Sequence, residues 1–183
     1  DSAGGLRGMK SDAWEGGHRM PFIARWPSQV EAGASTDQLV CFTDLMATFA
    51  DIVKVQLPPN AGPDSFSFLP VLTGEKSHNT IMRKSVVMKS GSGGLMTIRS
   101  GDWKFIDGRG SGGFSDRGLR GGDPLAEGDG NRQAAPKLQG AAGQLYNIKN
   151  DLAENRNLYT ERPEIVYRLK KEMAQIVRNN KSR

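Results

Sequence analysis

The chain has 183 residues, 37% hydrophobic and 23 of them glycine, which allows one domain with a core and leaves part of the chain outside it. Its 25 Lys and Arg residues exceed its 20 Asp and Glu residues, and the resulting net charge of +5 permits attraction to sulfate, phosphate or nucleic acid without requiring any of them. A single cysteine excludes an internal disulfide, and no apolar run approaches the length of a membrane span.

The first part of the chain predicts a loop, a strand and a helix. Residues 1–20 form a glycine-rich loop, and residues 22–26 predict a short strand bounded by two prolines, which supply no amide to a ladder. A helix is predicted from about Thr36 or Asp37 to Lys54, because good N-cap residues precede it. Its apolar residues step by three and four and predict one packing face, made of Leu39, Phe42, Met46, Phe49 and Val53.

The second part predicts an antiparallel meander. Short apolar runs at 85–89, 95–99 and 103–107 are separated by Gly- and Ser-containing turns, and residues 144–148 supply a fourth strand. The intervening residues 108–143 are rich in Gly, Arg, Asp and Ala, so we expect a long excursion from the sheet that is partly mobile.

A terminal helix is predicted from about Arg162 to Arg178, with Pro163 in its first turn. Its apolar residues recur at helical spacing and predict a face that packs on the sheet, made of Ile165, Leu169, Met173 and Ile176.

Residues 6–21 form the most informative segment and read Leu-Arg-Gly-Met-Lys-Ser-Asp-Ala-Trp-Glu-Gly-Gly-His-Arg-Met-Pro. They place a lone lysine, Lys10, in a loop flanked by Gly8, Gly16 and Gly17, which permit backbone turns that other residues resist. A lysine head is a compact cation with three donors. By residue type alone, however, an exposed lysine in solvent is the ordinary interpretation.

This segment resembles the Leu-Arg-Gly-x-Lys-x-x-x-x-Glu-Gly-Gly-x-Arg-x-Pro segment of the sulfatases, the arylsulfatase family of the alkaline-phosphatase-like superfamily. Two later stretches resemble family patterns in the same order. Residues 66–74 are similar to Gly-x-Ser-Leu-x-Pro-x-Leu-x-Gly, and residues 143–158 to Glu-Leu-Tyr-Asp-Leu-x-x-Asp-Pro-x-Glu-x-x-Asn-Leu, with Leu152 in place of the usual proline. The resemblance extends roughly from Gly5 to Leu158.

The resemblance implies the C-terminal portion of a sulfatase whose front is missing. The expected fold is an α+β fragment of an α/β alkaline-phosphatase-like fold, with a C-terminal antiparallel four-stranded sheet packed by a terminal helix. Residues 1–80 would form the C-terminal end of the catalytic domain. Residues 81–183 would form the C-terminal subdomain, with the Gly-rich excursion at 108–143.

The resemblance also implies a sulfuric ester hydrolase, with a carbohydrate sulfate as one candidate substrate. Lys10 would bind the sulfate group and neutralise charge as the S–O bond breaks. His18 and Arg19 are further candidates for substrate binding. Glu15 and Arg19 are also typical of a loop held by charge-assisted hydrogen bonds, and His18 of an exposed imidazole.

Sulfatases use a formylglycine, made from the Cys or Ser of a Cys/Ser-x-Pro-x-Arg motif, and a divalent cation, usually calcium, with oxygen ligands. Cys41 is followed by Phe-Thr-Asp and does not match, so we predict a buried, inert thiol. Asp44 matches the aspartate of the family's Asp-x-x-Pro-Thr pattern and is predicted to be a structural hydrogen-bond acceptor. We expect no cofactor in this chain and no turnover by it alone.

Two other interpretations remain open. The chain could be a non-catalytic polyanion-binding module that uses its basic, Gly-rich segment for nucleic acid or sulfated glycans. Residues 81–183 could instead serve only to cover the catalytic domain and form a subunit contact. Residues 108–113 formally satisfy Gly-x-Gly-x-x-Gly, but the residues that follow do not begin a helix, so a dinucleotide site is rejected.

The expected partner of the intact enzyme is a sulfated small molecule or glycan, and neither a membrane nor nucleic acid is favoured. The chain starts at Asp1 without an initiator Met or a signal-peptide pattern, so we expect it to begin within a longer protein. Family resemblance implies a periplasmic or extracellular location.

Overall fold

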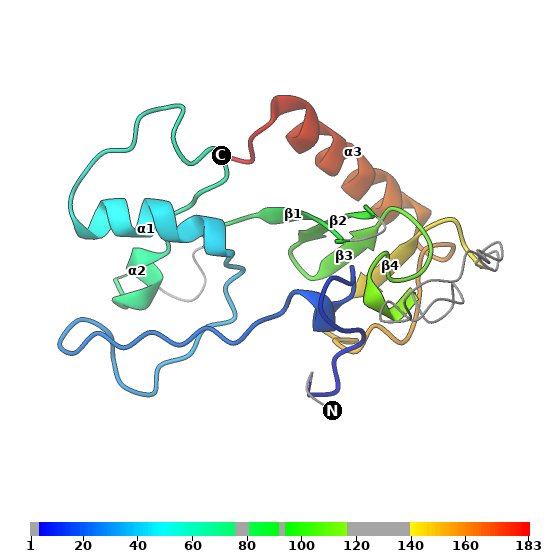
Figure 1. The fold of residues 1–183 in the computed structure, drawn as a ribbon, viewed down its shortest axis with the longest axis horizontal. Coiled ribbons are helices and arrows are strands. Elements are labelled where there is room, and N and C mark those ends of the chain that lie inside the picture. Colours follow the sequence, from blue (N-terminus) through cyan, green and yellow to red (C-terminus); the bar gives the residue numbers. More distant parts are fainter. Residues whose placement is uncertain (1–3, 76–80, 92–93, 117–139) are drawn as a thin grey trace, which may run out of the picture. The chain divides into compact units, whose positions relative to one another are not determined.

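The computed structural model describes residues 4–75, 81–91, 94–116 and 140–183 (Figure 1). The chain forms two compact units. One, called the sheet unit here, comprises Asp1–Met20 and Val87–Met173, and the other, called the α1 unit, comprises Pro21–Val86 and Ala174–Arg183.

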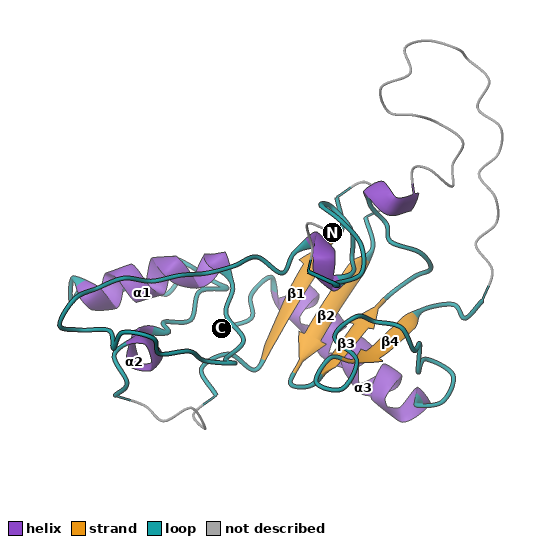
Figure 2. Cartoon of the chain, turned by 90° about the horizontal axis from the view of Figure 1, so that it is seen from below, coloured by secondary structure: helices purple, strands orange, loops and turns teal. Residues whose placement is uncertain are grey.

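The sheet unit is built on a four-stranded sheet with the order β1-β2-β3-β4 (Figure 2). The strands are β1 (Ser85–Lys89), β2 (Met96–Ser100), β3 (Trp103–Ile106) and β4 (Gln144–Asn147). β3 pairs antiparallel with both neighbours, so that Phe105 lies opposite Ile98 on one side and Leu145 on the other. The predicted meander is confirmed, because each strand pairs with the next one along the chain.

Helix α3 (Pro163–Asn179) covers one face of the sheet. Its buried residues Val166, Leu169 and Met173 recur at helical spacing, which confirms the predicted helix. Of the predicted packing face, Leu169 and Met173 are buried, whereas Ile165 and Ile176 are half-buried. Two polar contacts also tie the helix to the sheet unit. Glu172 accepts a hydrogen bond from the Ser100 hydroxyl at 3.1 Å, and Lys170 pairs with Asp107 at 3.1 Å.

The other face of the sheet is covered by the N-terminal loop. Alternation along β3 and β4 turns Ile106 and Tyr146 away from α3, and these two residues pack with Ala13 and Trp14 of the loop and with Ile148. The sheet unit therefore buries apolar residues on both faces, and the loop that contains Lys10 is part of its core.

The α1 unit contains a 3₁₀ turn at Phe42–Asp44, helix α1 (Leu45–Ile52) and the short helix α2 (Leu69–Leu72). The predicted helix start at residue 36 or 37 is wrong, because the 3₁₀ turn begins only at Phe42 and α1 only at Leu45. The Asp44 carboxylate, in the first turn of the helical segment, accepts the Cys41 N–H at 2.8 Å and so caps that segment. The backbone of Cys41 itself is extended, so the helical segment begins after it. The predicted strand at 22–26 is also absent, because this segment pairs with no other strand in the described residues.

The predicted packing face of α1 is the exposed one. Phe42, Met46, Phe49 and Val53 are exposed by 56%, 48%, 58% and 65%. The helix instead buries Ala47, Thr48 and Ala50. Cys41, predicted to be buried, is only half-buried.

Polar contacts explain this orientation of α1. The buried Arg83 guanidinium forms a two-pronged ion pair with Asp44, with N–O distances of 3.0 and 2.5 Å. Asp44 also accepts the Phe66 N–H at 3.0 Å, and the Ser65 hydroxyl accepts the Ala47 N–H at 2.8 Å. Asp44 is thus the structural acceptor that the sequence predicted, and it fixes which side of α1 faces inward.

Two sequence predictions, the excursion at residues 108–143 and the division into domains, are not tested by this fold. Residues 117–139, most of the predicted excursion, lie outside the described residues. The assignment of 1–80 and 81–183 to different sulfatase domains stays a prediction. Within the described segments, no helix combines the length and apolar character needed to cross a membrane.

Candidate active-site loop

Residues 9–12, called the Lys10 turn, form a tight turn closed at both ends. The Asp12 N–H donates to the Met9 carbonyl at 3.0 Å, and the Met9 N–H donates to the Asp12 carboxylate at 2.8 Å. Ser11 has φ 80°, a left-handed conformation that costs a non-glycine residue roughly 1–2 kcal/mol. Lys10 is exposed, and its ammonium has no hydrogen-bond or ion-pair partner in the described parts of the chain.

Three other segments of the sheet unit hold the Lys10 turn in place. The Gly91 N–H donates to the Ser11 carbonyl at 2.9 Å, and the Ala13 N–H donates to the Ser111 carbonyl at 2.7 Å. Ser115 donates to the Asp12 carboxylate twice, from its N–H at 3.1 Å and from its hydroxyl at 2.5 Å. The backbone of the Lys10 turn is therefore fixed, while the Lys10 side chain has no polar partner among the described residues.

Glycines allow these segments to approach one another closely. A Cβ at Gly113 would lie 2.3 Å from the Ser11 carbonyl oxygen, and one at Gly17 would lie 2.1 Å from that of Asp12. Only Gly8, with φ 85°, is needed for a left-handed turn as the sequence suggested. Gly16 and Gly17 are needed for close backbone approach instead, because neither has a positive φ and a Cβ at either one would collide with backbone oxygens.

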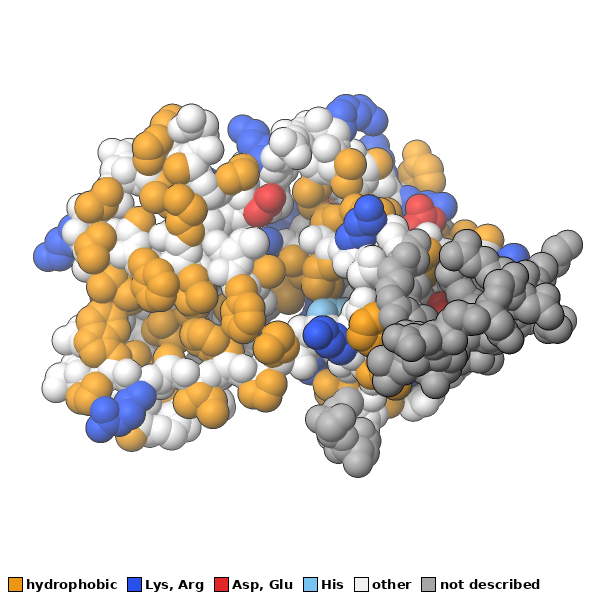
Figure 3. Space-filling view, viewed as in Figure 1, with side chains coloured by type: hydrophobic (Ala, Val, Ile, Leu, Met, Phe, Trp, Pro, Cys, Tyr) orange, Lys and Arg blue, Asp and Glu red, His pale blue; other side chains and the backbone are white. Residues whose placement is uncertain are grey.

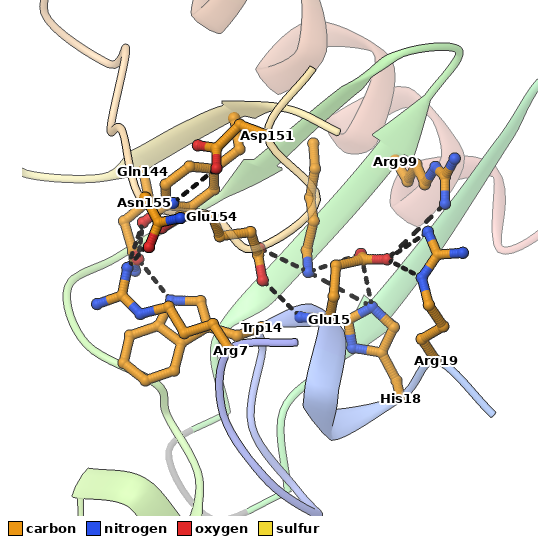
Figure 4. A network of polar contacts seen from close by, with 12 residues as sticks. Arg7, Trp14, Glu15, His18, Arg19, Arg99, Gln144, Asp151, Glu154 and Asn155 are labelled. Carbon is orange, nitrogen blue, oxygen red and sulfur yellow. Dashed lines mark hydrogen bonds and ion pairs between the residues drawn. The ribbon is translucent and has the colours of Figure 1, made fainter. Parts of the chain in front are cut away.

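A buried charge network lies beside the loop (Figure 4). Lys104 of β3 is completely buried, and its ammonium lies 3.0 Å from a Glu15 carboxylate oxygen and 2.9 Å from one of Glu154. The other Glu154 oxygen accepts the Glu15 N–H at 2.6 Å. One ammonium thus joins two buried carboxylates and ties the loop to β3 and to the segment that follows β4.

Two predicted site residues, His18 and Arg19, lie at the exposed rim of this network. Arg19 donates to Glu15 through two nitrogens, each at 2.7 Å, which confirms that this pair holds the loop. The His18 imidazole, predicted to be exposed, is half-buried. Its Nε2 lies 3.3 Å from the Glu15 carboxylate and 3.4 Å from the Lys104 ammonium, two partners that the sequence did not suggest. A role of either residue in substrate binding stays a prediction.

The start of the loop is held by an aromatic and amide cluster. The Arg7 guanidinium lies 3.8 Å from the Trp14 ring centroid and donates to the Glu154 carbonyl at 2.9 Å. The Trp14 indole and the Tyr146 hydroxyl both donate to the Gln144 side-chain oxygen, at 2.8 and 2.9 Å. The entry and the exit of the loop are therefore both attached to β4 and its following segment.

The carboxyl groups of Glu15 and Glu154 differ in the direction of their pKa shifts, although both lie beside the Lys104 ammonium. Burial by itself would raise the pKa of Glu15, but the hydrogen bond with His18 and the charge of Lys104 outweigh it, so the pKa lies well below its usual range. Burial raises the pKa of Glu154, and Lys104 offsets this only in part. Glu15 is therefore the firmly ionised member of the pair.

Lys104 and Glu154 were not identified from the sequence as a functional pair. The available signal was a lysine between two aromatic residues in a predicted strand, Trp103-Lys104-Phe105. Strand alternation places Lys104 on the same face as Ile106, and a lysine on a buried face requires a partner. Its partners come from positions 15 and 154, and no local pattern links such distant residues.

The described residues contain no group of three or more His, Cys, Asp or Glu side chains that could hold a metal ion. The part of the chain that the structure describes therefore does not fit a calcium site of the kind that the resemblance implies.

Residues 10–89 match the family model described as "N-sulphoglucosamine sulphohydrolase, C-terminal". These residues therefore belong to the C-terminal domain of the sulfatase family. The matched range includes residues 10–12 of the Lys10 turn, the α1 unit up to Val86 and strand β1.

Several known sulfatases are similar to this chain over most of its length. It is 28% identical to an N-acetylgalactosamine-6-O-sulfatase of Bacteroides thetaiotaomicron, over 97% of this chain and 30% of the relative. It is 26% identical to arylsulfatase G of Rattus norvegicus, over 85% of this chain and 27% of the relative. The chain thus spans less than a third of the length of these relatives.

Solved structures agree with the sequence relatives. A structure from work on the metabolism of multiple glycosaminoglycans by Bacteroides thetaiotaomicron matches with TM-score 0.70 and 27% identity, over 94% of this chain and 32% of that chain. The PsFucS1 sulfatase from Pseudoalteromonas sp. matches with TM-score 0.66 and 22% identity over the same shares, which supports the fold. The predicted fold class, part of an alkaline-phosphatase-like sulfatase with an antiparallel sheet and a terminal helix, is confirmed.

Proposed function

We propose that this chain is the C-terminal part of a sulfuric ester hydrolase in which Lys10 binds the sulfate group of the substrate. One observation carries the proposal. In a chain of the sulfatase family, an exposed lysine without a protein partner among the described residues stands on a turn whose backbone is fixed from three sides. An ammonium held in this way can neutralise negative charge on the sulfate as the S–O bond breaks.

The construction of the turn supports this role because electrostatic catalysis depends on preorganisation. The donors and glycines around Ser11 and Asp12 leave the backbone little room to shift. The left-handed Ser11 is a local strain that the surrounding contacts maintain, and such strain is concentrated at functional sites. The flexible lysine side chain then makes the final adjustment to the anion.

The proposed substrate is a sulfated small molecule or glycan, with a carbohydrate sulfate preferred. The support comes from the relative named N-acetylgalactosamine-6-O-sulfatase, which aligns with nearly the whole chain. His18 and Arg19 would contribute to substrate binding at the exposed rim of the Glu15 network. They would contact parts of the substrate other than the transferred sulfate.

The intact enzyme would use a formylglycine and a calcium ion. The residue that becomes the formylglycine and the residues that bind the calcium ion would lie outside this chain. The formylglycine would supply the nucleophile and the calcium ion would stabilise anionic oxygens. Within this proposal, the present chain contributes sulfate binding and the positioning of Lys10. We also propose an exported enzyme, periplasmic or extracellular, because sulfatases of this type are commonly exported.

A chimera tests the proposal. The matching third of the Bacteroides thetaiotaomicron N-acetylgalactosamine-6-O-sulfatase is replaced by this chain, and sulfate release from N-acetylgalactosamine 6-sulfate is measured with calcium present. The chimera should turn over and the isolated chain should not. Turnover by the isolated chain, or a folded chimera without any turnover, would contradict the proposal.

The polyanion-binding alternative has weaker support. In the described part of its Gly-rich segment, the Arg109 guanidinium donates to the carbonyls of Gly140 and Ala141, at 3.1 and 3.0 Å, and is thus used within the chain. Titration of the isolated chain with an oligonucleotide and a sulfated oligosaccharide at two salt concentrations separates the two functions. Submillimolar binding that weakens steeply with salt would favour the alternative.

A further inference from the structure

Arg99 of β2 lies directly opposite Lys104 of β3 in the antiparallel register. Opposite residues share one face of a sheet, so both cations lie on the face that the loop with Lys10 covers. Like charges in this arrangement destabilise a sheet. Glu15 reduces the repulsion, because its carboxylate lies 3.0 Å from the Lys104 ammonium and 3.9 Å from the Arg99 guanidinium.

The charge of Arg99 is compensated only in part. The Glu15 oxygen nearest to it already accepts two Arg19 nitrogens at 2.7 Å, and the buried Arg99 Nε has no hydrogen-bond partner among the described residues. Burial lowers the pKa of Arg99 and the charge of Arg19 adds to this shift, while Glu15 and Asp102 oppose it. The guanidinium therefore has donor capacity and positive charge that the described residues do not use.

The whole cluster holds more positive than negative charge. Three cations, those of Lys104, Arg19 and Arg99, surround two carboxylates, those of Glu15 and Glu154. Since burial raises the pKa of Glu154, its protonation would only increase the excess. Partly buried charge without a counter-ion is unfavourable, and a bound anion would remove that penalty.

The excess positive charge is accessible to a ligand. The side chains of Arg19, His18 and Arg99, called the basic rim, are exposed by 37%, 24% and 22%, whereas the two carboxylates and the lysine ammonium are buried. In Figure 4, Arg19 and Arg99 approach Glu15 on the side away from Glu154. The pale blue imidazole in Figure 3 is that of His18, since residue 78 lies outside the described residues, and it reaches the surface beside a basic side chain.

The basic rim adjoins the Lys10 turn. His18 and Arg19 directly follow the 3₁₀ turn at Glu15–Gly17, and a Cβ at Gly17 would lie only 2.1 Å from the Asp12 carbonyl oxygen. The backbone of the rim thus packs on the backbone that carries Lys10. This proximity allows one substrate to contact both.

We propose that Arg19 and Arg99 bind a second anionic group of the substrate, a carboxylate or a further sulfate, while Lys10 binds the sulfate that is released. The inference rests on the proposed function and narrows its substrate to a glycan with at least two negative charges. A guanidinium presents a planar fork of N–H donors that suits carboxylate and phosphate-like oxygens, including those of sulfate. Two guanidinium groups beside one buried carboxylate suit a single anionic group, whereas a polyanion requires many separate cations.

A sulfate titration of the isolated chain tests binding without any activity measurement. Sodium sulfate replaces sodium chloride at constant ionic strength, and NMR follows the arginine Nε–H resonances. Those of Arg19 and Arg99 should shift together and saturate, in the Lys10→Ala chain as well, whereas that of Arg168, an exposed arginine on α3, should not shift. Equal shifts of all three, or no shift at Arg19 and Arg99, would overturn the proposal.

Substrate choice in the chimera identifies the source of the anion. One pair of substrates is N-acetylgalactosamine 6-sulfate linked to a uronic acid and the methyl ester of that disaccharide. The other is N-acetylgalactosamine 4,6-disulfate and the 6-sulfate. The member with the extra charge should have a kcat/KM at least about 10-fold higher in one of the pairs, as expected for one charge-assisted contact. Preference in the first pair indicates a carboxylate, and preference in the second a sulfate.

Arg99→Gln should abolish this preference, and Arg99→Lys should retain part of it. Arg168→Gln is the matched control and should retain all of it. A chimera without preference, or with a preference that Arg99→Gln leaves intact, would overturn the proposal, and NMR shifts without preference would mean an adventitious ion only.

Failure of the proposed function gives a different result. If Lys10→Ala retains full activity, the proposed function fails, but the preference and its dependence on Arg99 are still measured. If the chimera does not turn over, the same ratios are measured as Kd values for the two pairs, with the same outcomes.

Discussion

The two compact units differ in how far they bury their apolar side chains. The sheet unit covers both faces of its sheet, with α3 on one side and the Lys10 loop on the other, and it pairs its buried charges internally. The α1 unit is held by a buried ion pair and a few hydrogen bonds, and its apolar residues Phe42, Met46, Phe49 and Val53 are exposed. Among the described residues, the sheet unit thus covers both faces of its sheet, whereas the α1 unit leaves an apolar stripe uncovered.

The comparison shows what an apolar stripe does and does not determine. α1 and α3 both carry apolar residues at helical spacing, yet α3 buries its stripe and α1 exposes it. Periodicity predicts which residues share a face. It does not predict what covers that face, which for α1 is decided by Asp44 and Arg83.

The largest effect is expected from Lys104→Met. This substitution keeps the volume but leaves Glu15 and Glu154 buried without their counter-ion, so the free energy of unfolding should fall by about 3–5 kcal/mol. Urea denaturation of the isolated chain measures the change. Lys170→Met is the control, because its pair with Asp107 is about half exposed and should contribute at most about 1 kcal/mol. Similar losses in the two variants would show that the network does not stabilise the fold.

Two phenylalanines give the most direct contrast between the units. Phe105 is 0% exposed and Phe49 is 58% exposed. Phe105→Ala should cost about 3–5 kcal/mol because it opens a cavity, whereas Phe49→Ala should change stability by no more than about 0.5 kcal/mol. Thermal or urea unfolding of the isolated chain tests both. A large loss for Phe49→Ala would mean that the α1 stripe is buried in solution.

Acid should weaken the sheet unit through Glu15. Its pKa is lower in the folded chain than its ordinary value near 4.5, so its contribution to stability is present above pH 4.5 and is lost as the pH falls below it. Glu154 has the opposite sign, because its raised pKa gives stability at low pH that is lost as the pH rises. Glu15→Gln should therefore flatten the loss of stability below pH 4.5, as followed by urea unfolding at a series of pH values. An unchanged acid dependence would contradict this role.

The smallest effect on stability is expected at the proposed sulfate ligand. Lys10 is exposed and forms no hydrogen bond or ion pair with the described residues, so Lys10→Ala should change the free energy of unfolding by no more than about 0.5 kcal/mol. The same measurement on Asp12→Ala should give a clear loss, because Asp12 is buried and accepts three hydrogen bonds from Met9 and Ser115. A loss at Lys10 as large as that at Asp12 would indicate a structural lysine.

The sequence predicted the parts of the fold that depend on local pattern. The four strands, α3 and the structural role of Asp44 follow from apolar spacing, turn residues and the family resemblance. The start of α1 was missed because Asp44, at the end of the 3₁₀ turn that precedes α1, caps the helical segment, whereas Ser35, Thr36 and Asp37 are the more obvious caps in the sequence. The strand predicted at residues 22–26 is absent, because these residues pair with no other strand in the described parts of the chain.

The candidate site was predictable only in part. Lys10, His18 and Arg19 lie in one motif, so a resemblance could identify them. Lys104 and Glu154 are 89 and 139 residues away from Glu15, and only the folded sheet unit brings them together. The sequence could therefore identify the residues of the motif and the Glu15–Arg19 pair that holds the loop, but not the distant partners Lys104 and Glu154.

The most direct measurement of the central claim is the effect of Lys10 on catalysis in the chimera. For hydrolysis of N-acetylgalactosamine 6-sulfate, Lys10→Ala should lower kcat/KM by at least about 100-fold, and Lys10→Arg should retain part of the activity. Lys181→Ala, an equally exposed lysine, should have no effect. Activity of Lys10→Ala equal to that of the unsubstituted chimera would contradict the proposal that this lysine binds the sulfate.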